Sequence, residues 1–517
     1  MAGQSRLWHF HGGLELPAHK SGSTTEPLTA APVPGVLIHP LSQHIGSPSE
    51  AIVAPGDYVK KGQPVASATG YIGSPVHAAS SGTVIDVGPQ PVPHPSGLSA
   101  DCVVIETDGR DDPYVGYDPL INYRTLNAPA LRARVRECGI VGLGGAAFPT
   151  SVKLNVGTGL KSLILNGAEC EPFISCDDML MRYRAEQIVS GAQIMLHVLE
   201  IRHCCIAIEE DKPESHQSLL KALSAAGDER IEVVRVPALY PEGGERQLIQ
   251  VLTGKEVPVG GIPADIGYLC QNVGTAVAVA RAVLRGEPLI SRIVTVTGSG
   301  VAQPRNLEVR LGTPISHVID ACGGYTEAAR YLVMGGGMMG FPLQGDQLPV
   351  IKATNCLLVA SEEDIRPRSP AMPCIRCGDC ATACPAQLLP QQLYWHTQSE
   401  EFDRVEDLNI YACIECGCCD LVCPSHIPLT QNFRYAKAQI WSQKRERERS
   451  DVARNRFEAR NARIAAEKSE RARRLAEKTR MLQTGAADPA AKKALIDEVM
   501  KRVGDKKDSS AEESGKE

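Results

Sequence analysis

Eight of the 18 cysteines in this chain fall in two copies of one short pattern. Residues 374–385 read CIRCGDCATACP, and residues 413–424 read CIECGCCDLVCP. Each copy is C-x2-C-x2-C-x3-C-P, in which a tight turn with thiolates three residues apart can hold one face of a cubane cluster. Iron binds thiolates strongly, so the two copies predict two [4Fe–4S] clusters.

The same spacing occurs in bacterial two-cluster ferredoxins, where the fourth cysteine of each run ligates the cluster of the other run. The resemblance predicts a two-cluster, ferredoxin-like helical domain. One ligand set is then Cys374, Cys377, Cys380 and Cys423, and the other is Cys413, Cys416, Cys419 and Cys384. Two zinc sites are the alternative, but they would leave the third cysteine and the proline of each run unexplained. Cys418 is interpreted as a packed small side chain.

Length and composition allow several domains, since the chain has 517 residues and 43% of them are hydrophobic. Residues 434–480 hold 16 Lys or Arg and 7 Asp or Glu, a local charge of +9 in a chain of net charge −6. The N-terminus lacks the apolar segment of a secretory signal, and no window approaches the ~20 apolar residues that span a bilayer. So many thiols therefore predict a soluble chain in a reducing cytoplasm.

Turn residues and apolar runs predict a multidomain α/β and α+β chain with six parts. These are an N-terminal segment (1–30), a strand-rich barrel-sandwich domain (31–115), an α/β domain with parallel strands (116–287), a small α+β module (288–360), the cysteine-rich domain (365–435) and a charged helical to disordered tail (436–517). The tail is expected to be helical because it is rich in Ala, Arg, Glu and Lys, and largely disordered beyond residue 480.

The strand-rich part resembles biotinyl and lipoyl carrier domains, with GDYVKKGQPV and PVHAASSGTV as the two matching halves. Those domains carry a modified lysine at the hairpin between the halves. Here the hairpin reads ATGYIG, and Tyr71 stands where the lysine is expected. We therefore expect a barrel-sandwich hybrid that serves as a scaffold. A prosthetic group on Lys60 or Lys61 would restore the carrier interpretation.

A second chemical signal is the glycine-rich run GIVGLGGAAFPTSVKL at 139–154. Glycines let the backbone approach a flat cofactor or a phosphate closely, although this run matches neither the dinucleotide fingerprint nor the Walker A loop. The run is followed by NGAECEP (166–172), ALYPEGGERQLIQVLTG (238–254) and QNVGTA (271–276). In this order, the segments resemble the NADH- and FMN-binding flavoprotein subunit of respiratory complex I.

That resemblance implies a Rossmann-like FMN/NADH domain followed by a β-grasp module. The residues it assigns to FMN are Gly142, Gly144, Gly145, Phe148, Lys153, Asn166, Asn272 and Thr275, and those it assigns to the nicotinamide nucleotide are Glu171 and Glu245. The chain departs from the complex I pattern at four positions. Leu143, Ala168, Gly244 and Gly274 stand where that family has Arg, Asp, Glu and Glu.

With the barrel-sandwich domain ahead and the cysteine runs behind, the chain resembles the C-subunit family of Rnf ion-translocating electron-transport complexes. The resemblance implies electron flow from NADH to FMN, to the two clusters and to partner subunits, or the reverse. It also implies a peripheral position on the cytoplasmic side of a bacterial inner membrane. The expected partners are membrane subunits, an iron–sulfur subunit and, indirectly, ferredoxin, with no nucleic acid. The alternative is a flavin-free iron–sulfur relay adaptor.

Overall fold

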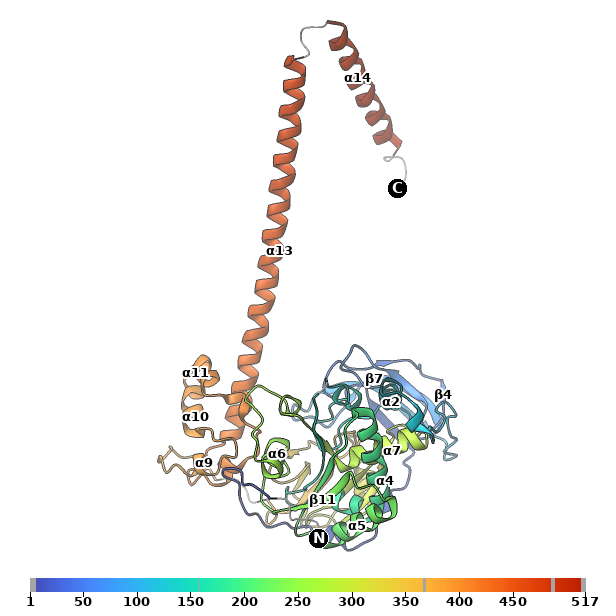
Figure 1. Cartoon of the computed structure of the whole chain (residues 1–517), viewed down its shortest axis with the longest axis vertical. Helices are drawn as coiled ribbons and strands as arrows, with labels where there is room; N and C mark the ends of the chain where they lie inside the picture. Colours follow the sequence, from blue (N-terminus) through green and yellow to red (C-terminus); the bar gives the residue numbers. More distant parts are fainter. Residues whose placement is uncertain (1–5, 158, 366–368, 485–488, 513–517) are drawn as a thin grey trace. The chain divides into compact units, whose positions relative to one another are not determined.

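The computed structural model describes residues 6–157, 159–365, 369–484 and 489–512 (Figure 1). Residues 1–437 form one compact unit and residues 438–517 form a second. The first unit contains every residue that the sequence analysis assigns to a cofactor, and it is described first.

Short antiparallel strands build the barrel-sandwich region. One sheet has the order β2-β8-β7-β4 and the other has the order β3-β5-β6. The strands are β2 (Val36–Pro40), β3 (Glu50–Ala51), β4 (Tyr58–Val59), β5 (Pro64–Ser67), β6 (Val76–His77), β7 (Gly82–Pro91) and β8 (Ser99–Thr107). Leu37, Val65 and Ile105 pack between the sheets. Tyr71 is 59% exposed, and its hydroxyl accepts a hydrogen bond from Asn155 Nδ2 (2.9 Å).

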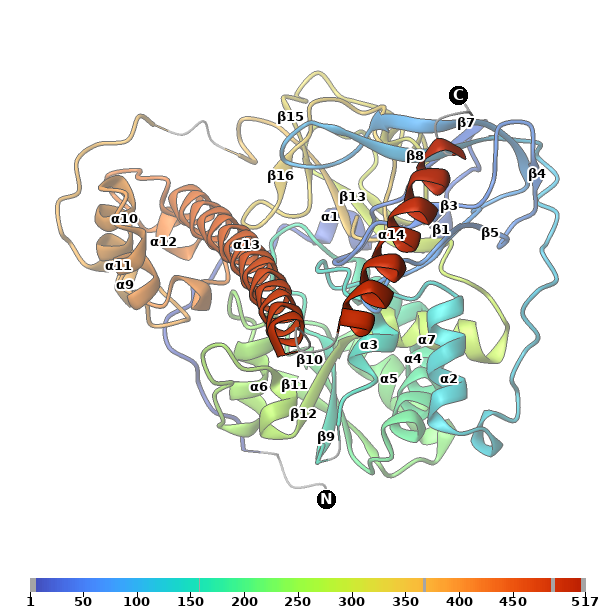
Figure 2. The same cartoon turned by 90° about the horizontal axis from the view of Figure 1, so that it is seen from above.

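A four-stranded parallel sheet forms the centre of the α/β region, in the order β11-β10-β9-β12. Its elements are α2 (Ala128–Glu137), α3 (Thr150–Lys153), β9 (Ser162–Gly167), α4 (Cys176–Leu199), β10 (Cys204–Glu209), α5 (Pro213–Ala226), β11 (Ile231–Val236), α6 (Glu245–Thr253), β12 (Tyr268–Asn272) and α7 (Val273–Leu284). Leu163 and Leu165 pack into the core that holds α4 and α7, whereas Ile164 packs with Leu248 and Ile249 of α6. Helices therefore cover both faces of the sheet (Figure 2).

The strand order of this sheet reverses at β9. The chain runs from β9 outward through β10 to β11, and then returns to add β12 on the other side of β9. In open parallel sheets, ligands bind outside the carboxyl ends of the strands at such a switch point. A ligand site is therefore expected at the segment that follows β9 and at the start of α7, which follows β12 directly.

A third, six-stranded sheet follows, in the order β1-β14-β13-β17-β15-β16. Its elements are β1 (Thr29–Ala30), β13 (Ser291–Thr297), β14 (Arg305–Arg310), α8 (Ile315–Asp320), β15 (Tyr331–Met334), β16 (Phe341–Pro342) and β17 (Cys356–Ala360). Strand β1 comes from the N-terminal segment and pairs in parallel with β14. The N-terminal segment is thus part of the sheet formed by the 288–360 module.

The two cysteine runs fold alike. Each ends in a one-turn helix, α9 (Asp379–Thr382) or α12 (Cys418–Leu421), and α10 (Pro390–Gln398) and α11 (Phe402–Asp407) lie between them in the sequence. Matching positions adopt the left-handed region. Arg376 and Glu415 have φ of 61° and 59°, and Gly378 and Gly417 have φ of 90° and 79°. The sequence repeat is therefore also a backbone repeat.

Helix α13 (Leu429–Thr484) begins in the first unit and continues into the second, which also contains α14 (Pro489–Glu512). Most described side chains of the second unit are exposed. Helix α14 lies where composition favoured disorder, and its Leu495, Ile496, Val499 and Met500 recur at helical spacing. Within the described ranges, we find no helix with the length and apolar character that crossing a membrane requires.

Candidate flavin and iron–sulfur sites

Two asparagines predicted to contact flavin meet at the switch point. Asn166 is the penultimate residue of β9 and Asn272 is the last residue of β12, and the two are partners in the parallel register. Asn166 donates a hydrogen bond to the Gly243 carbonyl (2.8 Å). Asn272 Oδ1 accepts from the Gly274 amide (2.8 Å) at the start of α7, and its Nδ2 donates to Asp177 (2.6 Å). The carboxyl end of the sheet at the switch point is thereby bordered by the segment after β9 and by the start of α7.

The glycine loop lies against the end of β12. The Leu143 amide donates to the Thr275 hydroxyl (3.0 Å), and the Gly142 amide donates to the Phe148 carbonyl (2.8 Å). Gly144 and Gly145 are exposed, and their amides donate to no acceptor in the described part of the chain. A Cβ atom on Gly145 would meet nothing within 4 Å. This face of the loop therefore offers free N–H groups and open space.

Lys153 and Glu245 form one ion pair, with Nζ 2.6 Å from Oε1. Lys153 lies on α3, and Glu245 begins α6, where the helix dipole favours a carboxylate. The two side chains are 29% and 38% exposed. Partly exposed pairs contribute only ~0–1 kcal/mol, so an incoming phosphate can replace Glu245 beside Lys153 at little cost.

Glu171, the other acid assigned to the nicotinamide nucleotide, contacts the 288–360 module. Its carboxylate accepts hydrogen bonds from the amides of Met338 (2.7 Å) and Met339 (3.0 Å), in the loop between β15 and β16. Burial raises the pKa of this carboxyl group. A Cβ atom on Gly336 would lie 2.2 Å from Glu171 Cγ, so this close approach requires a glycine. Glu171 therefore connects the α/β domain to the 288–360 module.

Sequence reasoning missed three polar residues around the switch point. Glu242 is 1% exposed and neither of its carboxylate oxygens has a described hydrogen-bond partner, and burial raises its pKa to about 8. The Thr150 hydroxyl is also buried and unpartnered among the described residues. Burial raises the pKa of Asp177 to about 7. The sequence signal for Glu242 is the run PEGGE. Glu242 lies two residues before Gly244, and Gly244 stands where the complex I pattern has an acid.

The donor set at the switch point suits flavin mononucleotide. Free amides of Gly144 and Gly145, the Lys153 ammonium group and the start of α7 supply donors for a phosphate and for the polar edge of a flavin. Phe148 is half-buried, and its ring stacks on no other ring among the described residues. The buried Thr150 hydroxyl has no hydrogen-bond partner among the described residues, so it is available to a bound ligand.

The cysteines gather in two separate cavities. The cavity that we call proximal is lined by Cys384, Cys413, Cys416 and Cys419, and the cavity that we call distal is lined by Cys374, Cys377, Cys380 and Cys423. Cys418 also borders the proximal cavity and is fully buried. Each cavity thus receives one cysteine from the other run, and the remaining lining is mostly apolar. The donor sets suit iron–sulfur clusters.

The two cavities differ in their surroundings. Cys384, Cys416 and Cys419 of the proximal cavity are buried, whereas Cys377 of the distal cavity is exposed. The buried Tyr240 hydroxyl, from the loop before α6, donates to the Cys416 carbonyl (2.6 Å). Tyr240 therefore joins the α/β domain to the proximal cavity.

An N-terminal strap, residues 8–20, runs across this junction. The Gly13 amide donates to the Ala383 carbonyl (3.2 Å), and His11 Nδ1 lies 3.0 Å from the Cys384 carbonyl. Leu14 forms an antiparallel bridge with Tyr240. The strap therefore contacts both the cysteine-rich domain and the α/β domain.

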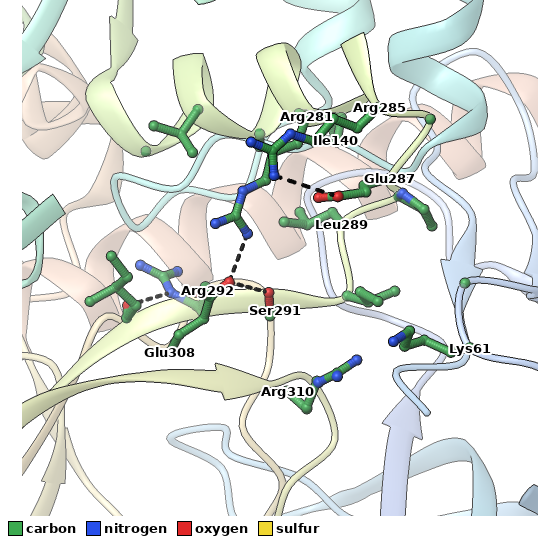
Figure 3. Close-up of a pocket in the computed structure, with 18 of the residues that line it drawn as sticks. Lys61, Ile140, Arg281, Arg285, Glu287, Leu289, Ser291, Arg292, Glu308 and Arg310 are labelled. Carbon is green, nitrogen blue, oxygen red and sulfur yellow. Dashed lines mark hydrogen bonds and ion pairs between the residues drawn. The ribbon is translucent and has the colours of Figure 1, made fainter. Parts of the chain in front are cut away.

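A cavity of about 710 Å³ lies elsewhere (Figure 3). It borders Leu143 and Gly274 but, among the described residues, none that the complex I resemblance assigns to FMN or NADH. Each cation in its wall already has a partner. The pairs are Lys61 and Arg310 with Asp111, Arg281 with Glu308, Arg285 with Glu287, and Arg292 with backbone carbonyls. We interpret the cavity as the junction of three domains.

Comparison with known families assigns four regions. Residues 8–110 match the RnfC barrel sandwich hybrid domain, residues 135–281 the Nuo51 FMN-binding domain, residues 293–342 the SLBB domain and residues 373–427 the 4Fe-4S dicluster domain. These matches confirm a barrel-sandwich hybrid, an FMN-binding domain and an iron–sulfur domain in the predicted order. The fold and the matches thus define a chain that combines an FMN-binding domain with a 4Fe-4S dicluster domain.

The chain belongs to the C-subunit family of ion-translocating oxidoreductase complexes, as the sequence resemblance predicted. It is 48% identical to the family member from Erwinia tasmaniensis over 90% of this chain and 58% of the relative. For Cronobacter sakazakii the values are 45%, 97% and 64%, and for Serratia proteamaculans they are 46%, 91% and 67%. The chain therefore spans about three fifths of the length of the first two relatives.

Among solved structures, the chain is similar to a crystal structure of an NAD+-reducing [NiFe]-hydrogenase in the air-oxidized state. The identity is 22%, the TM-score is 0.42, and the match covers 56% of this chain and 58% of that chain.

Proposed function

We propose that this chain exchanges electrons between NADH and two [4Fe–4S] clusters through FMN bound at the switch point. The observation that carries the proposal is the meeting of Asn166, Asn272 and the exposed glycine loop in one unit with two cysteine cavities. NADH gives up two electrons as a hydride, whereas each cluster accepts one, and bound flavin supplies the chemistry that connects the two.

In this proposal the FMN contacts are Gly142, Gly144, Gly145, Phe148, Lys153, Asn166, Asn272 and Thr275. Glu245 is proposed to release Lys153 when a ligand phosphate arrives, and then to face the nicotinamide nucleotide. The ion pair of 2.6 Å supports this exchange. Glu171 is given a different role, because its oxygen already accepts two backbone amides. We assign it to fixing the loop after β9.

The order of the clusters follows from their surroundings. We propose that the proximal cluster receives electrons from the flavin, because Tyr240 binds the Cys416 carbonyl at 2.6 Å. The distal cluster then passes them to a partner, because Cys377 is exposed beside Met372 and Ile375, which are 64% and 68% exposed. This surface suits an iron–sulfur partner subunit.

At the level of the complex, we propose a peripheral subunit on the cytoplasmic face of a bacterial inner membrane. Family membership supports association with membrane subunits of the same complex, and exchange with ferredoxin would then be indirect. The finer fold assignments belong to the same proposal. They are a Rossmann-like FMN/NADH domain, a β-grasp module at 288–360 and a ferredoxin-like domain at 365–435.

The test is an anaerobic NADH titration of the purified chain with its clusters reconstituted, followed by visible absorbance and low-temperature EPR. Flavin bleaching together with a reduced-cluster signal is expected. Clusters that are reduced by dithionite, in a chain that binds no flavin and does not respond to NADH, would overturn the proposal. That outcome would favour the flavin-free relay.

A further inference from the structure

Two buried cations from the 288–360 module hold the inner side of the glycine loop. Arg292, on β13, is 6% exposed, and its Nη2 donates to the Leu143 carbonyl (3.1 Å). Lys352 is 1% exposed, and its Nζ donates to the Gly139 carbonyl (2.8 Å). Arg292 also donates to the carbonyl of Lys352 itself. The two cations thus form one connected support behind the loop (Figure 3 shows Arg292).

The bond to Leu143 fixes the direction of the next amide. A trans peptide is planar, so its C=O and N–H groups point in opposite directions. Because the Leu143 carbonyl points inward to Arg292, the N–H of Gly144 points to the exposed side of the loop. A charged donor on the carbonyl also polarises the peptide and strengthens its N–H as a donor. Arg292 therefore orients and strengthens a free amide on the face proposed for flavin.

Lys352 has no carboxylate partner within the described ranges. Its Nζ donates to the Ser74 hydroxyl (3.1 Å) and to the carbonyls of Pro75 (3.0 Å) and Gly139. Burial lowers its pKa to about 7, so a substantial fraction of this group is charged near neutral pH. Burial also lowers the pKa values of the neighbouring His39 and His77, to about 4 and about 3. These imidazoles are neutral and add no compensating charge.

Arg292 donates to the carbonyls of Ile293, Lys352 and Leu143. The acidic groups near it are the Cys176 thiol and the carboxyl groups of Asp177 and Glu169, and burial raises the pKa of all three. The Glu169 carboxylate already accepts the amides of Asp177 and Asp178 at the start of α4. Within the described ranges, neither Arg292 nor Lys352 donates a hydrogen bond to a carboxylate, so two buried cations lie behind the glycine loop. In a buried setting such charge acts over several ångströms with little screening.

We propose that Arg292 and Lys352 are positioning residues of the flavin site, which hold the Gly144 amide toward the flavin and favour its reduced form. The inference rests on the proposed function, because it requires FMN on the exposed face of the glycine loop. Flavin gains negative charge on reduction, so positive charge behind the loop stabilises the reduced form more than the oxidised form. The complex I pattern has an arginine in the loop, where this chain has Leu143. Arg292 brings a guanidinium to that residue from another domain.

The test measures FMN affinity in both redox states for the full chain, stripped of flavin and with its clusters intact. Oxidised FMN is followed by fluorescence quenching, and reduced FMN by anaerobic titration. Arg292→Met is expected to weaken oxidised FMN about tenfold, as for loss of a charge-assisted hydrogen bond, and reduced FMN a further threefold or more. Lys352→Met is expected to lower the preference for reduced FMN with a smaller change for oxidised FMN.

Two further variants separate charge from packing. Arg292→Lys keeps the charge and shortens the reach, so it should weaken both forms while preserving most of the preference for reduced FMN. Arg310→Met is the matched control, because Arg310 lines the same cavity but pairs with Asp111. It should change neither affinity. Circular dichroism and iron content verify folding, and the comparison of the two redox states is made with Lys352→Met and Arg292→Lys if Arg292→Met does not fold.

The outcomes are distinct. Equal weakening of both forms by Arg292→Met and Lys352→Met would mean that the residues only maintain structure, and would overturn the inference. Unchanged affinities would overturn it as well. If the unaltered chain binds no FMN, the proposed function fails, and the inference fails with it. A selective loss for reduced FMN in the two methionine variants, absent in Arg310→Met, supports the inference.

Discussion

The cysteine-rich domain and the flavin-binding domain build their sites from the chain in different ways. All eight candidate cluster ligands lie in two short runs whose backbones repeat each other, down to the left-handed Arg376 and Glu415. The candidate flavin site draws on the carboxyl ends of β9 and β12, on the glycine loop and on buried cations from another domain. The first site thus depends on local spacing, and the second depends on how neighbouring domains pack.

The largest effect is expected when one cysteine ligand is removed from either of the two cysteine cavities. Cys416→Ser should remove the proximal cluster and leave flavin reducible by NADH without electron transfer to the remaining cluster. Cys377→Ser should remove the distal cluster and leave transfer from flavin to the proximal cluster. Each variant should lose about half of its iron, since each cavity is proposed to hold one of two similar clusters. Iron content and EPR after NADH addition test this, and identical EPR spectra of the two variants would contradict the proposed order.

Removing iron should affect the folding of the two domains differently. Chelation under reducing conditions should unfold the cysteine-rich domain, because metal ligation contributes its folding free energy. The flavin-binding domain has its own parallel sheet and apolar core, so FMN affinity should change less than about threefold. Limited proteolysis should then cut within residues 373–427. Resistance of that region in the iron-free chain would show that its apolar contacts suffice.

In the flavin-binding domain, Glu242 predicts a pH effect on stability. Burial raises its pKa from 4.5 to about 8, so the folded chain keeps a proton that the unfolded chain releases between these values. The folded chain binds more protons, and the free energy of unfolding therefore falls as pH rises through this window. Glu242→Gln should reduce this loss, by on the order of 3 kcal/mol at pH 8.

Urea unfolding at pH 5 and pH 8 measures this effect. Glu229→Gln, at an exposed carboxylate of the same domain, is the matched control and should leave the pH dependence unchanged. A Glu242→Gln variant with the pH dependence of the unaltered chain would show that Glu242 releases its proton at an ordinary pH.

The smallest expected effect lies at the junction of the two domains. Tyr240→Phe leaves the buried Cys416 carbonyl without its 2.6 Å donor, which should cost about 1–2 kcal/mol of stability. It should also shift the reduction potential of the proximal cluster but not of the distal one. Thermal unfolding and redox titration monitored by EPR measure both quantities. Equal shifts in both clusters would argue against a local effect of the Tyr240 hydroxyl.

The sequence predicted the cysteine cavities more completely than the candidate flavin site. The grouping of the cysteines could be predicted because a fixed spacing and an internal repeat encode it locally. The order of the glycine run, Asn166 and Asn272 indicated the flavin region, but Arg292 and Lys352 could not be found in this way. Their partners Leu143 and Gly139 lie more than 100 residues earlier, and an arginine in a β-strand gives no sign of the carbonyl that it contacts. The partner of Glu171 was missed for the same reason.

The N-terminal strap has a consequence for biosynthesis. Residues 8–20 are translated before the cysteine-rich domain, yet Gly13 and His11 bind the carbonyls of Ala383 and Cys384, which are translated hundreds of residues later. The strap therefore has to wait for the cysteine-rich domain to emerge. If that domain lacks iron and does not fold, the strap loses its contacts with Ala383 and Cys384. An accessible N-terminal segment then distinguishes an immature chain from a mature one, and it offers proteases a basis for selecting chains that never received their metal.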